Sequence, residues 1–169
     1  FPHHIFREYD IRGVADRDLD DALVTALGDA FADRAPAGPI AMARDCRLTS
    51  PRLGEALGRG LRRHAEVIDL GIVPSPVLYF ATHTLPVTAG VVITGSHNPA
   101  PDNGFKLLVG TAALHGGDIA ALGEEVARRL RSTAGAEPPL QPLRHHDLVP
   151  SYLDHAAGCL RLGPRRCRV

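Results

Sequence analysis

The sequence VTAGVVIT at residues 87–94 runs directly into the polar sequence GSHNP at residues 95–99. Val91, Val92 and Ile93 form a continuous apolar run instead of alternating with polar residues, which is typical of a strand buried on both faces. Such a strand lies in a sheet that has helices on either side. The sequence therefore predicts a central strand over 87–94 and a loop at its carboxyl end, where open α/β sheets place their ligands.

Helical and strand patterns alternate along the rest of the chain. Leu19, Leu23 and Leu27 recur at every fourth position, which predicts a helix over 18–34. Further helices are expected where Ser or Asp caps a helical pattern, and at the last apolar segment; they begin at Ser50-Pro51, Ser75-Pro76, Asp118 and Leu148. The other expected strands cover residues 40–43, 67–70 and 105–109. This order predicts an α/β fold with a mixed, mostly parallel sheet flanked by helices on both faces.

The periodic pattern ends near residue 132. Residues 132–146 contain Pro138, Pro139 and Pro142, which predicts a linker. A last helix is expected to run from Leu148 to Leu160, and residues 166–169 look like the start of a strand.

Composition and charge argue against several classes of protein. Nineteen Lys and Arg residues balance nineteen Asp and Glu residues, which argues against binding to nucleic acid or to an anionic membrane. No apolar run approaches the ~18 residues that a membrane span needs. The three cysteines show no CxxC spacing and indicate a reducing cytoplasm rather than a disulfide frame or a zinc site. The histidine pairs at 3–4 and 145–146 have no Cys or carboxylate at ligand spacing, so we expect them to be solvated.

The loop after the central strand has the residues of a rigid, exposed turn. Gly95 allows backbone angles that other residues avoid, and Pro99 restricts the residue before it, so Ser96 is expected at the loop tip. Asn103-Gly104 is a strong turn signal, and a turn there would bring Lys106 back near the serine. These residues alone leave three roles open for Ser96: a nucleophile, a phosphorylation site, or part of a solvated turn.

Four segments, in the same order, resemble the α-D-phosphohexomutase superfamily. The central one, Thr94–Pro99 with Asn103–Lys106, is similar to the phosphoserine loop of that family. The other three are similar to its N-terminal motif, the exit of its first strand and its helix-opening segment; they are Phe6–Gly13, Ala43–Arg47 and Gly71–Phe80. The Thr-Gly-Ser form of the loop favours the bacterial phosphomannomutase/phosphoglucomutase branch. The chain thus resembles the N-terminal, phosphoserine-bearing domain of these enzymes.

The resemblance implies that the chain carries a phosphoryl group. In the family, the serine that matches Ser96 donates this group to a hexose phosphate and takes back the other phosphate from the 1,6-bisphosphorylated sugar. It also implies Mg²⁺, with Ser96 as one ligand through its phosphate, and glucose or mannose 1,6-bisphosphate as activator and intermediate. The other metal ligands of the family are aspartates of an Asp-Gly-Asp-Gly-Asp motif, which these 169 residues do not contain.

The resemblance gives roles to five further residues. Arg12 matches an arginine close to the phosphoserine, and Tyr9 matches a residue that reaches the bound sugar. Two structural roles stay open beside these: an ion pair with a neighbouring carboxylate for Arg12, and simple packing for Tyr9. Lys106 is a candidate proton shuttle or phosphate clamp. His97 and Asn98 either contact the substrate phosphate or brace the loop.

Two arginines at the end of the expected strand 40–43 have a different expected role. For both Arg44 and Arg47, we expect an ion pair at the strand exit rather than a part in catalysis.

The expected organisation follows from the resemblance. Residues 1–142 would form the first domain of a phosphohexomutase, and residues 143–169 the linker, helix and first strand of a truncated second domain. We expect such a chain to be cytoplasmic and inactive alone, with a hexose phosphate substrate and the remaining domains of the same enzyme as its partners.

Two other classes of function stay open. The chain could be a non-catalytic module that binds phosphosugars or another protein. Alternatively, Ser96 could be a hydrolase nucleophile, although the Gly-x-Ser-x-Gly elbow is absent because Asn98 stands where its second glycine belongs.

Overall fold

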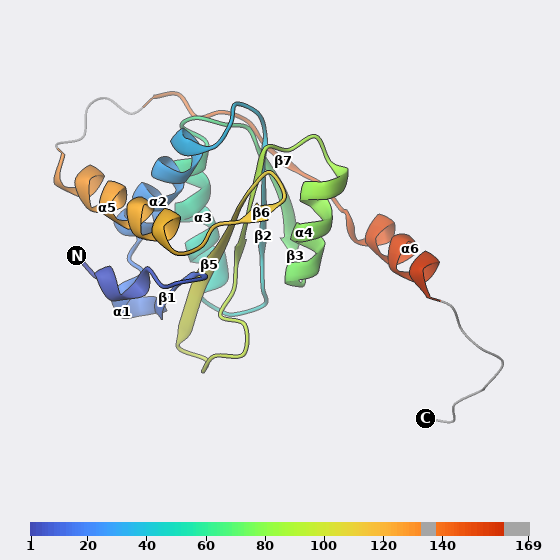
Figure 1. Cartoon of the computed structure of the whole chain (residues 1–169), viewed down its shortest axis with the longest axis horizontal. Helices are drawn as coiled ribbons and strands as arrows, with labels where there is room; N and C mark the ends of the chain where they lie inside the picture. Colours follow the sequence, from blue (N-terminus) through green and yellow to red (C-terminus); the bar gives the residue numbers. More distant parts are fainter. Residues whose placement is uncertain (133–137, 161–169) are drawn as a thin grey trace.

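The computed structural model describes residues 1–132 and 138–160 (Figure 1). A short 3-10 helix, His3–Ile5, precedes the first strand. The strands of the single sheet are β1 (Ile11–Val14), β2 (Ile40–Arg44), β3 (Val67–Ile72), β4 (Ala89–Ile93), β5 (Asp102–Val109), β6 (Ala112–Ala113) and β7 (Leu143–His145). The helices are α1 (Ala15–Asp18), α2 (Asp21–Arg34), α3 (Ser50–Leu61), α4 (Ser75–Thr84), α5 (Gly117–Arg131) and α6 (Val149–Cys159).

The sheet has the strand order β1-β5-β4-β2-β3-β7, and β6 pairs with β5. Strands β4, β2, β3 and β7 run parallel to one another. Strand β5 is antiparallel to β4, because the chain returns directly from β4 to β5 through the loop at 94–101. It is also antiparallel to β1. The predicted α/β fold with a mixed sheet is confirmed, with antiparallel pairing concentrated at the β1–β5 side.

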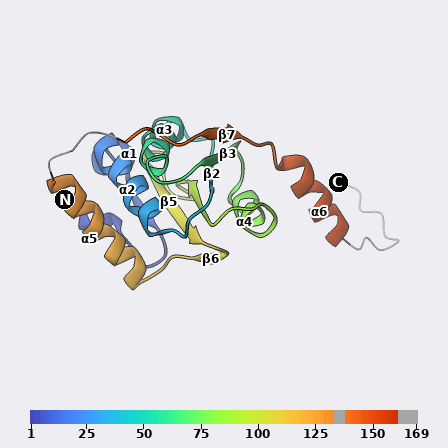
Figure 2. The ribbon, with the colours of Figure 1, turned by 90° about the horizontal axis from the view of Figure 1, so that it is seen from above.

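Helices cover both faces of the sheet, as predicted (Figure 2). Ile40 and Met42 of β2 belong to one core cluster, which they share with α2, α3 and α5. Ala41 and Ala43 alternate with them and pack in a second cluster with α4 on the opposite face. All five residues of β4 are buried, which confirms that its continuous apolar run marks a strand between two layers.

Helices α2 and α3 approach each other backbone to backbone at two glycines. A Cβ atom added to Gly60 would lie 2.0 Å from the carbonyl oxygen of Thr25, and one added to Gly28 would lie 2.3 Å from that of Leu57. No side chain fits at either position, so this pair of glycines sets the close packing of the layer that supports β2 and β4.

The helix starts differ from those predicted. The helix expected over 18–34 begins at Asp21, after the separate short helix α1, and Asp20 caps α2 by accepting a hydrogen bond from the Leu23 N–H at 2.8 Å. The predicted caps Ser50, Ser75 and Asp118 are wrong: each lies inside its helix, and the N-cap positions are held by Thr49, Pro74 and Gly116. The Ser50 hydroxyl instead donates to the Asp45 carboxylate at 2.6 Å.

Asn103-Gly104 is not a turn; both residues lie inside β5. The chain reverses before them, and Gly104 pairs with Arg12 of β1. A Cβ atom on Gly104 would lie 2.2 Å from the Ile11 carbonyl oxygen, so the glycine is needed for close contact between strands. Asn103 is fully buried and cross-links β5 to the start of α3.

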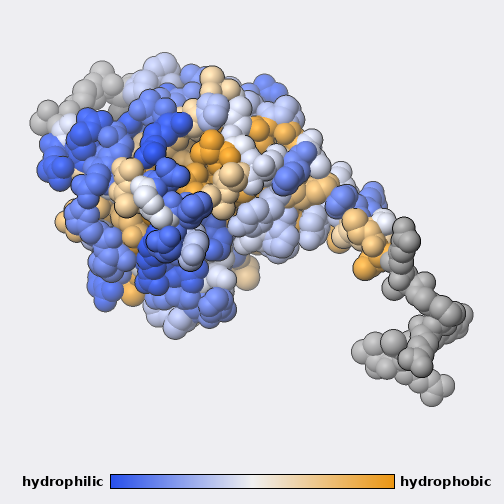
Figure 3. Space-filling view, in the orientation of Figure 1, coloured by the Kyte–Doolittle hydropathy of each residue, from blue (hydrophilic) through white to orange (hydrophobic). Residues whose placement is uncertain are grey.

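The predicted linker is wrong at residues 143–145, which form β7 and extend the sheet beside β3. Beyond β7, α6 extends away from the body (Figure 1), and its Tyr152 packs edge-on against Phe80 of α4 with ring centroids 5.6 Å apart. Apolar side chains show at the surface of α6 (Figure 3), where Leu153 is exposed. The strand expected at 166–169 lies outside the described residues, and the domain boundary at 142 stays a prediction.

No helix in the described part of the chain is both long enough and apolar enough to cross a membrane.

Candidate functional site

Ser96 lies at the tip of the loop that leaves β4, where the chain reverses toward β5. Its side chain is exposed, and its φ of 53° is in the left-handed region. The Ser96 N–H donates to the Thr94 hydroxyl at 2.9 Å, and the Asn98 N–H donates to the Gly95 carbonyl at 3.0 Å. These bonds make a tight turn that presents the serine hydroxyl to solvent, as the sequence predicts.

Because a residue with a side chain is strained at this φ, Ser96→Gly should stabilise the protein by up to about 1 kcal/mol. Ser96→Ala removes the same hydroxyl but keeps the strain, so it should give no such gain. Urea unfolding of the two variants measures the difference, and equal stabilities would contradict a strained loop tip.

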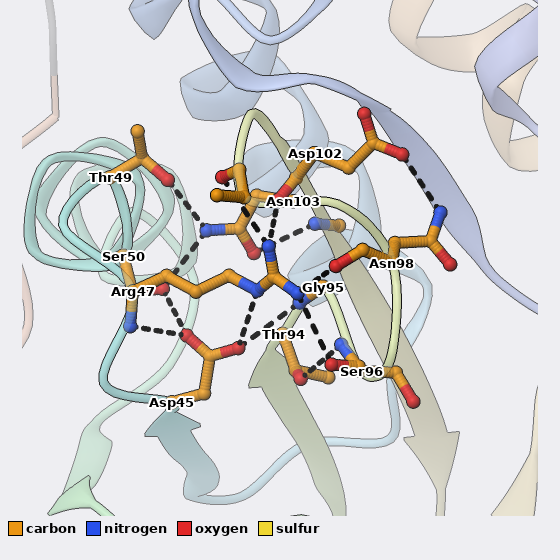
Figure 4. A network of polar contacts seen from close by, with 12 residues as sticks. Asp45, Arg47, Thr49, Ser50, Thr94, Gly95, Ser96, Asn98, Asp102 and Asn103 are labelled. Atoms are coloured by element: carbon orange, nitrogen blue, oxygen red, sulfur yellow. Dashed lines mark hydrogen bonds and ion pairs between the residues drawn. The ribbon is translucent and has the colours of Figure 1, made fainter.

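The Arg47 guanidinium lies inside the loop (Figure 4). Its Nη1 donates to the carbonyl oxygens of Pro99 at 2.7 Å and Asp102 at 2.9 Å, and its Nη2 donates to those of Asn98 at 2.6 Å and Ser96 at 3.2 Å. The predicted ion pair is also present, with Nε 3.4 Å from the Asp45 carboxylate. The ion pair expected for Arg44 forms with Asp69 at 3.2 Å.

Asp45 joins the start of α3 to the loop. One carboxylate oxygen accepts from the Ser50 hydroxyl at 2.6 Å and from the Arg47 N–H at 3.0 Å, and the other accepts from the Gly95 N–H at 3.1 Å. Burial alone would raise the pKa of this carboxyl, but these hydrogen bonds outweigh burial and hold the pKa below its usual value.

The lowered pKa makes the contribution of Asp45 to stability depend on pH. An ionised Asp45 stabilises the fold above its unfolded pKa of about 3.9, and this contribution is lost as the pH falls through the lower folded pKa. Wild type should therefore exceed Asp45→Asn in free energy of unfolding by about 1–3 kcal/mol near neutral pH. The gap should narrow when urea unfolding is repeated in acid, and a gap that does not change with pH would contradict the assignment.

A second polar cluster reaches the loop from β1 and β5. Arg12 is buried; it donates to the Asn98 side-chain oxygen at 2.5 Å and to the Asp10 carboxylate at 2.5 Å. The Lys106 ammonium contacts the same Asp10 oxygen at 3.2 Å. The Asn98 amide also donates to Asp102 at 2.8 Å. Asp10 thus holds two cations beside the loop, at a position where an added anion would be attracted.

The remaining predicted residues lie at the outer side of this arrangement. The His97 Nδ1 is 3.3 Å from the Ser96 hydroxyl, and no ion pair of the described residues joins His97 to a carboxylate. Tyr9 is 71% exposed and precedes Asp10 directly in the chain. An open pocket of about 640 Å³ adjoins the loop. Its lining residues include Asp45, Cys46, Leu48, Val73, Pro74, Ser75, Ser96 and Asn98.

Reasoning from sequence missed three residues that organise this site. Asp10 is part of the N-terminal motif; its contact with Arg12 is local, but its contact with Lys106 reaches across to β5. Arg47 lies 51 and 52 residues from the loop carbonyls of Asn98 and Pro99 that it contacts. The local sequence predicts a turn at Asn103, whereas the residue lies inside β5. The signal that was available is that each lies within a motif segment already matched to the family.

A metal ion at this site would depend on a phosphate carried by Ser96. In the described part of the chain, no group of three or more His, Cys, Asp or Glu side chains is placed to hold a metal. The carboxylates of Asp45 and Asp10 are already engaged by arginine. The site therefore fits Mg²⁺ only if a phosphate on Ser96 supplies one ligand. The remaining metal ligands would have to come from outside the described residues.

Comparison with known proteins gives consistent matches. Residues 3–130 match the family model described as "Phosphoglucomutase/phosphomannomutase, alpha/beta/alpha domain I". The chain is 36% identical over 162 residues to a phosphoglucomutase of Neisseria meningitidis, with 94% of this chain and 35% of that protein covered. It is 38% identical over 156 residues to a phosphomannomutase/phosphoglucomutase of Pseudomonas aeruginosa, with 89% and 32% covered.

A solved structure of a phosphoglucomutase/phosphomannomutase family protein from Burkholderia thailandensis superposes with a TM-score of 0.84 at 34% identity. The superposition covers 95% of this chain and 36% of that one. The chain thus spans about a third of the length of these relatives, and its fold and sequence agree with their first domain. It belongs to the phosphoglucomutase/phosphomannomutase family.

Proposed function

We propose that this chain supplies the phosphoryl-carrying serine of a phosphohexomutase that interconverts hexose 1-phosphates and hexose 6-phosphates of mannose or glucose. The observation that carries the proposal is the presentation of Ser96: an exposed hydroxyl at a strained loop tip, with Arg12 and Lys106 held beside the loop by Asp10. An exposed alcohol can hold a phosphoryl group as a stable ester, and neighbouring cations favour the charge of that ester.

The proposed transfer begins with Ser96 phosphorylated. The free hydroxyl of a hexose monophosphate attacks the phosphorus, the bond between phosphorus and the Ser96 Oγ breaks, and the 1,6-bisphosphorylated sugar forms. The Lys106 ammonium is proposed to donate a proton to the leaving Ser96 oxygen and to regain one from the attacking hydroxyl, so that Lys106 ends the step as it began. After the 1,6-bisphosphorylated sugar has reversed its orientation in the site, the same steps in reverse return its other phosphate to Ser96.

Arg12 and Asn98 are proposed to orient the phosphate, and His97 and Tyr9 to contact the substrate from the exposed side. Asn98 is bonded to both Arg12 and Asp102, which supports the bracing role for its side chain. Mg²⁺, bound through the phosphate of Ser96 and through ligands outside the described residues, would neutralise the charge that develops during transfer.

The proposal extends to conditions and partners. Glucose or mannose 1,6-bisphosphate would load Ser96, and the remaining domains of the same enzyme would supply the other contacts to hexose phosphate. We place the protein in the cytoplasm, which the free thiols of Cys46 and Cys159 support.

A hybrid enzyme tests the function. Residues 1–130 would be joined to the downstream part of the Pseudomonas aeruginosa relative, and conversion of glucose 1-phosphate to glucose 6-phosphate would be measured with Mg²⁺ and glucose 1,6-bisphosphate. We expect turnover by the hybrid and none by the 169-residue chain alone. A folded hybrid that binds hexose phosphate without turnover would support the binding-module alternative. Labelling of Ser96 in the isolated chain by a fluorophosphonate would support a hydrolase.

A further inference from the structure

We propose that Arg47 is a positioning residue, whose guanidinium gathers the carbonyl groups of the Ser96 loop and thereby sets the orientation in which Ser96 carries its phosphoryl group. This inference deepens the proposed function and rests on it. It assigns to Arg47 a role beyond the ion pair at the end of β2.

The contacts of Arg47 are almost all with the backbone of one loop. Its two terminal nitrogens donate to five carbonyl oxygens at 2.6 to 3.4 Å; these are the carbonyls of Ser96, Asn98, Pro99, Ala100 and Asp102. These carbonyls belong to Ser96 and to residues that follow it on the way into β5. One planar group therefore fixes the loop between Ser96 and β5, which a flexible ammonium group with its smaller reach cannot do.

The same contacts arrange charge around Ser96. The carbonyl oxygens are the negative ends of peptide dipoles, and Figure 4 shows them turned toward the guanidinium at the centre of the loop. A phosphoryl dianion on the exposed Ser96 hydroxyl would be repelled by carbonyl oxygens that faced it. By holding them inward, Arg47 lowers this repulsion without contacting the phosphate.

Asp45 holds the arginine in place. Its carboxylate lies 3.4 Å from the Arg47 Nε and also accepts from the Gly95 N–H at 3.1 Å. The Arg47 side chain is 16% exposed, so the ion pair is partly shielded from water and orients the guanidinium between the strand exit and the loop.

Gly95 provides the space for this arrangement. A Cβ atom on Gly95 would lie 2.3 Å from Arg47 Nε and 2.4 Å from Cζ. No left-handed φ is present at Gly95, so the steric requirement comes from the guanidinium and not from the backbone angle. Gly95 and Arg47 should therefore be energetically coupled.

A double-mutant cycle tests the coupling in the 169-residue chain. Amide hydrogen exchange would be followed by NMR at Ser96, Asn98 and Asp102, with Val91 of β4 as reference. Gly95→Ala should speed exchange in the loop by about tenfold or more in wild type, but by less than about twofold when Arg47→Ala is already present. Equal effects of Gly95→Ala in both backgrounds would overturn the proposal.

Arg52→Lys is the matched control. Arg52 also donates to two backbone carbonyls, those of Leu19 at 3.2 Å and Ala15 at 3.0 Å, but neither carbonyl belongs to the loop. Arg47→Lys should speed exchange in the loop by about tenfold, whereas Arg52→Lys should leave it unchanged. If Arg47→Ala does not fold, this pair of charge-conserving variants carries the test, and equal loop exchange in both would overturn the proposal.

The ³¹P NMR signal of a phosphoserine at position 96 distinguishes a positioning role of Arg47 from a role in stability alone. Phosphoserine would be encoded at position 96 and titrated by ³¹P NMR. Arg47→Lys keeps the charge, so a rise of the phosphate pKa toward the value of about 6 for free phosphoserine would report lost orientation. An unchanged titration would contradict the positioning role. Neither readout depends on turnover, so a failure of the hybrid enzyme would count against the proposed function alone.

Discussion

Ser96→Ala should abolish mutase turnover in the hybrid enzyme, with a loss of at least about 10⁴-fold. Without the hydroxyl, no phosphoserine ester can form, and the cations beside the loop have no phosphoryl group to stabilise. The loss should occur without loss of fold, because the Ser96 side chain is exposed and its hydroxyl contacts only the adjacent His97 among the described residues.

Thr111→Ala provides the control for removal of an exposed hydroxyl. Thr111 lies beyond the far end of β5, in the turn toward β6, and is exposed. It should keep the turnover of the parent hybrid. Rates and thermal unfolding would be measured on both variants. Residual turnover within about tenfold of the parent in Ser96→Ala, in a folded protein, would show that Ser96 does not carry the phosphoryl group.

Gly60→Ala should destabilise the chain by about 3 kcal/mol or more, since overpacking at a backbone contact cannot be relieved by moving a side chain. The added Cβ would lie 2.0 Å from the Thr25 carbonyl oxygen and 2.6 Å from the Asp29 nitrogen. Helices α2 and α3 would have to separate, which weakens the layer under β2 and β4. We expect the unfolding temperature to fall by on the order of 10 °C.

Gly54→Ala is the matched control in the same helix. Its Cβ would find ordinary contacts, 3.7 Å from the Arg44 Cδ and from the Ile93 Cδ1. Alanine is the better helix former, so this change should stabilise the protein by about 0.5–1 kcal/mol. Calorimetry of the two variants gives the comparison. Similar unfolding temperatures would show that the glycine contact between α2 and α3 is not as tight as the geometry states.

The fold could be predicted from sequence where local pattern and burial agree. The apolar run of β4 predicts a strand buried on both faces, and the leucine repeat of α2 predicts the buried face of a helix. The structure confirms both predictions. The predicted secondary structure was wrong where a long-range contact overrides the local sequence signal. Asn103-Gly104 has the composition of a turn, yet its small glycine is required by the close approach of β1.

The ends of elements were harder to predict for a related reason. Ser50 has the residue type of an N-cap, but its hydroxyl bonds with Asp45 across the strand exit. The prolines at 138–142 indicate irregular chain, so the short strand β7 that follows them is not expected from the sequence. Strand β7 forms by pairing with the open edge of β3. Neither partner is visible from the local sequence.

Some residues of the candidate site could be predicted from the sequence and others could not. Ser96 could be predicted, because the identity of the loop residues is itself the signal. The roles of Asp10 and Arg47 could not, because the atoms they bind come from distant segments: Lys106 for Asp10, and the backbone of the loop for Arg47. Backbone acceptors leave no mark in the sequence, so a residue that binds them looks like any surface arginine.

Peptide-resolved mass spectrometry tests the central claim most directly. The hybrid enzyme would be incubated with Mg²⁺ and glucose 1,6-bisphosphate, digested, and searched for phosphate on each peptide, with Ser96→Ala as the control. We expect one phosphoryl group, localised to Ser96 and absent from the control. A hybrid that turns over while its Ser96 stays unmodified, or that carries the phosphate on another residue, would contradict the assignment of Ser96 as the phosphoryl carrier.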